Sequence, residues 1–91
     1  MSYRIKVLGA EAALPTTIGA ATSFTEATVV RLVNTSASAD YVVTVVQTQS
    51  GPSIGSFTLL RQTTEVIEKQ SSHCVYASNA AVLGAKVGFT N

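Results

Sequence analysis

Residues 28–34 read Thr-Val-Val-Arg-Leu-Val-Asn, and residues 41–47 read Tyr-Val-Val-Thr-Val-Val-Gln. Both runs are rich in β-branched side chains, which lose rotamer freedom in a helix and fit the pleated surface of a sheet. The connection between them, residues 34–40, is polar and made of small residues, so the two runs are predicted to form a hairpin. They indicate a protein built from antiparallel strands.

The same period of two continues on both sides of these runs. At the C-terminus Leu83, Ala85, Val87 and Phe89 fall on one face of a predicted strand. Further strands are predicted at 3–7, 54–60, 64–69 and 73–77. About seven strands at a spacing of roughly 8–12 residues indicate an all-β fold, a single small antiparallel β-sandwich or barrel.

The chain is predicted to form one domain, residues 1–91, because a single hydrophobic core serves chains of this length. Residues 10–27 interrupt the strand pattern. They are expected to form a long loop or an arm, and residues 10–14 could make one helical turn before Pro15. Cys74 is the only cysteine, so no internal disulfide can form, and stability must come from core packing or from partner subunits.

The sequence predicts that two classes of partner, nucleic acids and membranes, are absent. The net charge is +1, and no basic run could neutralise a row of phosphates, so no nucleic-acid binding is expected. No segment has the ~18 uncharged apolar residues that span a bilayer, and no signal peptide is evident, so no membrane association is expected. Because neither a membrane-spanning segment nor a signal peptide is evident, the protein is expected to be made in a cytoplasm.

The residues that could carry chemistry do not combine into a recognisable site. His73 and Cys74 are adjacent, so on a strand they point to opposite faces and cannot form a catalytic dyad. Glu65 and Glu68 are three residues apart, so on a strand they too lie on opposite faces and read as solvated edge charges. No metal-ligand spacing occurs. We therefore expect no enzyme activity, no catalytic or metal-binding residues, and no cofactor.

Valines on both faces of one strand suggest a partner. Residues 42–46 place valines on both sides of a strand, and residues 29–33 do the same. A strand that is apolar on both sides must be covered on both sides. Since 91 residues with no long helix offer no outer layer, a second subunit is the predicted cover, and the protein is expected to be a homo-oligomer or an assembly component.

The chain also resembles a known class of proteins. The runs RLVNT, GSFTL, EVIEK and AVLGAKV, spread over residues 28–88, resemble small all-β structural proteins of tailed bacteriophages, of the cyanophage virion accessory type. This resemblance implies a decoration or cement protein that stabilises the capsid in many copies, located in the virion and bound to the major capsid protein or to neck and tail proteins. It carries over no functional residue.

Two alternatives stay open. Within the phage class, the chain could be a neck, tail or fibre module instead of a capsid protein. In another class, it could be a carbohydrate-binding β-sandwich module, with Tyr41 or Tyr76 stacking on a sugar.

Overall fold

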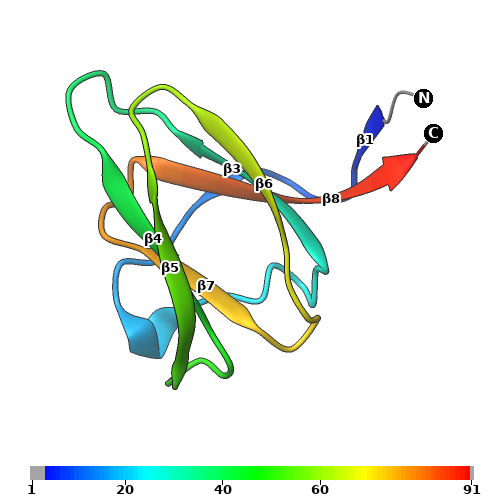
Figure 1. The fold of residues 1–91 in the computed structure, drawn as a ribbon. Coiled ribbons are helices and arrows are strands. Elements are labelled where there is room, and N and C mark those ends of the chain that lie inside the picture. The colour runs from blue at the N-terminus through cyan, green and yellow to red at the C-terminus, as the bar shows by residue number, and fades with distance from the viewer. Residues whose placement is uncertain (1–3, 91) are drawn as a thin grey trace.

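The computed structural model describes residues 4–90, except for the side chains of Ile18 and Thr90. Within that range the regular secondary structure consists of strands and one short 3-10 helix, η1 (Ile18–Ala20) (Figure 1). The eight strands are β1 (Arg4–Val7), β2 (Ala12–Ala13), β3 (Val29–Asn34), β4 (Tyr41–Val46), β5 (Ser53–Leu59), β6 (Thr64–Glu68), β7 (Cys74–Ala77) and β8 (Val82–Thr90). Tyr3, which the sequence placed in the first strand, lies outside the described residues.

The strands form two antiparallel sheets that face each other. The larger sheet has the order β1-β8-β3-β6, and β2 pairs with β8 on the same side as β1. The smaller sheet has the order β5-β4-β7. The predicted all-β fold is confirmed: it is sandwich-like and does not close into a barrel. The strand beyond the expected seven is β2, two residues long.

The predicted hairpin between residues 28–34 and 41–47 is wrong. β3 pairs with β6 and β8, whereas β4 pairs with β5 and β7, so the two valine-rich strands lie in different sheets. Their connection crosses from one sheet to the other. The hairpin is formed instead by β4 and β5, whose connection contains the turn at Gly51 and Pro52.

Asn34 stabilises the connection at the point where the chain crosses between the sheets. Its side chain is fully buried, and its Nδ2 donates to the carbonyl oxygens of Ala39 and Leu59, each at 3.0 Å. Its Oδ1 accepts from the backbone N–H of Ser36 at 2.9 Å. A buried amide with these partners is satisfied, and it fixes the β3–β4 connection to the end of β5.

The core lies between the sheets and selects one face of each strand. Val30 and Leu32 of β3, Val43 of β4 and Val82 of β8 have no exposed surface, and all four belong to one apolar cluster. Because Val82 faces this core, alternation along β8 turns Leu83 and its neighbours at every second position outward. The more apolar face of the last strand is therefore the outer face of the sandwich.

Residues 10–27 cover one side of the sandwich and do not form an arm. Leu14 is buried in the core and donates its N–H to Val82 O at 2.9 Å, and Thr22 forms a β-bridge with Val75 of β7. The segment thus runs from the edge of the larger sheet to the edge of the smaller one. The expected helical turn at residues 10–14 is also wrong, because Ala12 and Ala13 pair with β8.

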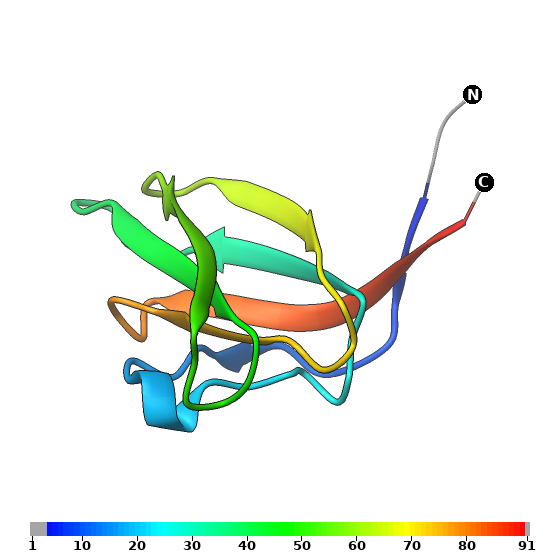
Figure 2. The ribbon, with the colours of Figure 1, turned by 60° about the horizontal axis from the view of Figure 1, so that its bottom comes forward.

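The element that does project is the ribbon, which we define as β1 together with the C-terminal end of β8. β3 pairs with β8 only as far as Lys86, whereas β1 pairs with β8 from Val87 to Thr90. Beyond the body of the sandwich the ribbon is two strands wide, and it points away from the sheets (Figure 2). Every described residue of β1 is exposed.

Candidate interaction surfaces

The outer face of the larger sheet carries mostly apolar side chains, some exposed and some buried. Strand alternation and the pairing register place the following residues on this side: Ile5, Val7, Val29, Val33, Val66, Leu83, Ala85, Val87 and Phe89. The surface is most open on the ribbon, where Ile5 is 44% and Val7 71% exposed. We call these nine residues the outer apolar face.

Two charged residues cross this face and neutralise each other. Arg31 lies opposite Ala85 in the register, and its Nη1 donates to Glu11 Oε2 at 3.3 Å. Both side chains are about two-fifths exposed. An exposed ion pair of this kind contributes little stability. Ala85, the register partner of Arg31, is only 6% exposed. The outer side of the larger sheet thus combines apolar side chains with the ion pair between Arg31 and Glu11.

The sequence predicted that a second subunit covers both valine-rich strands; for β3 this stays a prediction, whereas the chain itself covers most of the outer side of β4. Val46 and Cys74 face outward from the smaller sheet, yet both are buried, because Ala21 packs with them in a second apolar cluster. The residues just after η1 therefore provide the cover that the sequence analysis assigned to a partner. Val42, at 42% exposure, is the part of β4 that they leave open.

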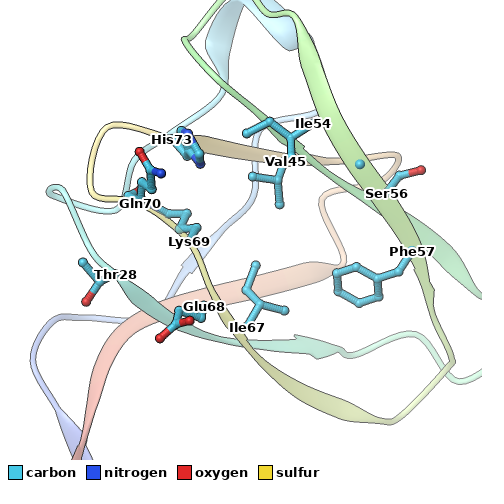
Figure 3. Close-up of a pocket in the computed structure, with 11 residues that line it drawn as sticks. Thr28, Val45, Ile54, Ser56, Phe57, Ile67, Glu68, Lys69, Gln70 and His73 are labelled. Atoms are coloured by element: carbon cyan, nitrogen blue, oxygen red, sulfur yellow. Dashed lines mark hydrogen bonds between the residues drawn. The ribbon is translucent and has the colours of Figure 1, made fainter.

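A cleft opens on the side of the sandwich opposite to residues 10–27. β5 and β6 are the edge strands of the two sheets, and they do not pair with each other. The cavity between them has a volume of about 690 Å³, within the usual range for ligand sites. Val45, Phe57 and Ile67 converge on it from three strands (Figure 3). Its interior is apolar.

The rim of the cleft is polar. Lys69 lies on this rim, where its ammonium binds backbone carbonyl oxygens. The Lys69 side chain is 7% exposed, and its Nζ donates to Ala27 O at 2.7 Å, to Ser23 O at 3.0 Å and to Gln70 O at 3.4 Å. Burial lowers the pKa of this ammonium from its ordinary value of 10.5. With all three N–H donors occupied, Lys69 is not available to hold an anion.

The ammonium of Lys69 stabilises an unusual turn. Phe24, Thr25 and Glu26 all have positive φ angles, of 53°, 57° and 58°. Ala27 N donates to Ser23 O at 3.0 Å, which closes a single left-handed helical turn. Such a turn is unfavourable for L-residues, so the lysine that binds its carbonyl oxygens offsets part of the cost. The turn places the Phe24 ring against Gly84.

The structure separates the residues that sequence analysis considered for catalysis. His73 is half-buried and lines the cleft, whereas Cys74 begins β7 and packs into the second cluster on the outer side. Glu65 lies opposite Leu32 and Glu68 opposite Val29, so the two carboxylates are on different faces of β6. Strand alternation separates the two carboxylates, as the sequence predicted, whereas His73 lies just before β7 and not on it.

Two further features bear on the class of site. Between residues 4 and 90, no group of three or more His, Cys, Asp and Glu residues is placed to bind a metal ion. No helix in the same range has the length and apolar character needed to cross a membrane.

Comparison with known proteins gives no family assignment. Neither protein-family models, nor curated proteins, nor solved structures match the chain. The resemblance to phage accessory proteins therefore remains a prediction from sequence, and the surfaces described above are the basis for a functional proposal.

Proposed function

We propose that this protein is a structural accessory protein of a tailed-phage virion, acting in many copies as a decoration or cement protein of the capsid. The observation that supports this function is the exposed part of the outer apolar face: Ile5, Val7 and Phe89 are 44%, 71% and 53% exposed, whereas Val29, Ala85 and Val87 of the same face are buried. A contiguous apolar surface of this kind on a small soluble fold is typical of an interaction site. The partners in this proposal are further copies of the chain and the major capsid protein.

The low charge of the chain fits the same role. Charged residues make up 12% of the sequence, and Arg31 on the outer side of the larger sheet pairs with Glu11. A cement protein works by covering joints between shell subunits, and apolar contacts supply most of the binding free energy in such stable interfaces. A neck, tail or fibre module would use the same contacts, so its position on the particle separates the two roles.

The carbohydrate-binding alternative has less support. Tyr41 is half-buried against the main core, and Tyr76 is half-buried against the second cluster. A sugar-stacking site needs an aromatic face open to solvent.

The test is binding of the purified protein to particles of the phage that encodes it. Charges on the outer apolar face, in the variant Val33→Lys with Leu83→Lys, should abolish co-sedimentation with the particles. Leu60→Lys is the matched control, because Leu60 is 55% exposed but lies outside this face. Circular dichroism must show that both variants are folded. Immunogold electron microscopy then locates the protein on the capsid or at the neck and tail.

Two results would contradict the proposal. One is that the parent protein fails to bind the particles and is also monomeric in solution. The other is that the outer-face variant binds the particles as well as the Leu60→Lys control.

A further inference from the structure

We propose that copies of this protein join head to tail, with the ribbon of one copy occupying the cleft between β5 and β6 of the next. In this arrangement β1 adds as a strand to the free edge of β6 in the neighbouring copy. The inference rests on the proposed function, because it specifies how the copies assemble.

The first argument is that both elements have an unpaired backbone edge. β1 pairs with β8 along one edge only, and β6 pairs with β3 along one edge only. No backbone hydrogen bond within residues 4–90 uses the other edge of either strand. Unpaired edges bind a further strand readily, and strand addition is a common mode of protein recognition.

The second argument is fit in length and polarity. A four-residue strand spans about 13 Å, so β1 is shorter than either β5 or β6. Ile5 and Val7 lie on one face of β1, and the cleft offers Val45, Phe57 and Ile67 to receive them. A two-stranded ribbon is only marginally stable alone in water, so apolar cover would stabilise it.

The third argument is charge. Within the described range, Arg31 pairs with Glu11, Arg61 pairs with Asp40, and Lys69 and Lys86 bind backbone carbonyl oxygens. The remaining charged side chains have no hydrogen-bond or ion-pair partner there. The basic ones, Arg4 and Lys6, are both on β1, and two of the three acidic ones, Glu65 and Glu68, are on β6; the third is Glu26.

One of the two acidic residues of β6 matches the proposed arrangement: Glu68 lies on the outer side of β6, whereas Glu65 lies on the side of Ile67. With Ile5 and Val7 turned into the cleft, alternation directs Arg4 and Lys6 to the other side of β1, toward Glu68 at the rim. His73 also lines the cleft, and Lys69 at the rim keeps its own carbonyl partners. Complementary charge of this kind fixes register and speeds association.

The occupant is a second copy because the ribbon cannot reach its own cleft. The ribbon leaves the sandwich at one end and points away from β5 and β6 (Figure 2). A contact between two different surfaces of identical chains is heterologous, and it produces a ring if the rotation closes or a filament if it does not. Either form suits a protein that assembles in many copies.

The first test reverses the charges. Arg4→Glu with Lys6→Glu, and separately Glu65→Lys with Glu68→Lys, should each weaken self-association by about tenfold or more in sedimentation velocity at low salt. The chain that carries all four substitutions should regain the parent association to within about threefold, because both surfaces are then reversed. Glu26→Lys is the control, since Glu26 is acidic and lacks an ion-pair partner in the described range but is not on β6; it should leave association unchanged.

The second test locates the contact by disulfide trapping. A mixture of Ile5→Cys chains with Ile54→Cys chains should give disulfide-linked dimers that neither variant gives alone, because Ile54 lines the cleft. Leu60→Cys in place of Ile54→Cys should not cross-link. The native Cys74 is buried and unpaired, so the parent chain serves as the background control.

The outcomes separate this inference from the function on which it rests. Oligomers in which Ile5→Cys chains cross-link only to each other would overturn the head-to-tail contact and leave the virion role standing. Failure of the four-fold variant to regain association, although folded, would also overturn it. So would a small apolar molecule found in the monomer by native mass spectrometry and retained by Arg4→Glu with Lys6→Glu, since the cleft would then belong to a ligand. A protein that neither associates nor binds particles would overturn both proposals.

Discussion

Asn34 shows how a single buried polar residue can anchor a connection between two sheets. Its side chain makes three hydrogen bonds to backbone groups, and no other described residue joins the same segments in this way. Replacement by alanine leaves two carbonyl oxygens and one N–H without these partners in or near the core. We expect Asn34→Ala to lower the free energy of unfolding by about 2–4 kcal/mol, measured by urea denaturation.

Asn79 provides the control for this prediction. Its Oδ1 also accepts a backbone N–H, that of Ala81 at 2.9 Å, but the bond lies in an exposed turn. Asn79→Ala should therefore cost less than about 1 kcal/mol, because water replaces the lost partner. Equal losses in the two variants would show that burial of the Asn34 amide is not what makes it important.

Gly84 is required because an aromatic ring occupies the space of a side chain. A Cβ at this position would lie 2.5 Å from Phe24 Cζ and 3.1 Å from Leu32 Cδ2. We expect Gly84→Ala to destabilise the protein by about 1–3 kcal/mol through overpacking. In Gly55→Ala, the matched change on β5, the new Cβ meets nothing within 4 Å, so thermal denaturation should show little change. A similar loss in both variants would contradict the steric explanation.

At the scale of elements, the left-handed turn depends on the strand that it packs against. Lys69 follows β6 and binds two carbonyl oxygens of the turn, whereas Lys86 of β8 binds only Thr25 O, at 3.1 Å in an exposed position. Lys69→Met should cost about 1–3 kcal/mol, because a buried carbonyl oxygen loses its partner. Lys86→Met should cost less than about 1 kcal/mol. The prediction fails if the two variants have the same melting temperature.

The two connections at one end of the sandwich are joined by Asp40 and Arg61. Asp40 Oδ1 accepts from the backbone N–H of Arg61 at 2.9 Å and from its Nε at 3.1 Å. These hydrogen bonds hold the pKa of Asp40 below its ordinary value of 3.8. A folded-state pKa below the unfolded one means that the pair stabilises the protein above about pH 4 and loses this effect as the pH falls through the folded value.

The pH dependence gives a measurable difference. The melting temperature of the parent protein should fall relative to that of Asp40→Asn between pH 4 and pH 2, and the two should differ by a constant amount above pH 5. Salt should reduce the difference at neutral pH, because the pair is exposed. Parallel pH profiles for the parent and the variant would show that Asp40 does not contribute to acid sensitivity.

The strands were predictable from the sequence, and their partners were not. Alternation located most of the strands because one buried face imposes a period of two on each of them. Pairing is set by contacts distant in sequence, such as the bond between Asn34 and Leu59 O, and β4 lies in the other sheet. For the same reason neither the ribbon nor the cleft was foreseen, since each is formed by strands that lie far apart in the chain or fail to pair.

At the scale of the whole molecule, the two sides of the sandwich are unequal. Residues 10–27 bridge one pair of sheet edges, while β5 and β6 remain apart on the other side. Residues 10–27, which contain little strand, therefore cover one side of the sandwich. The ribbon extends β8 beyond the sandwich. In the head-to-tail arrangement that we propose, the open edge of β6 and the projecting β1 are the two halves of one contact, and neither edge is paired in the isolated chain.

This asymmetry predicts an uneven pattern of amide hydrogen exchange. In dilute protein, amides of β8 near Gly84 should exchange slowest, because β8 there lies between β2 and β3. Amides of β1 should exchange at least ~100-fold faster, because a two-stranded ribbon opens locally. At concentrations where the protein associates, β1 and the outer edge of β6 should gain protection together. Protection of the ribbon in the monomer equal to that of Gly84 would contradict the prediction, since the ribbon would then need no partner.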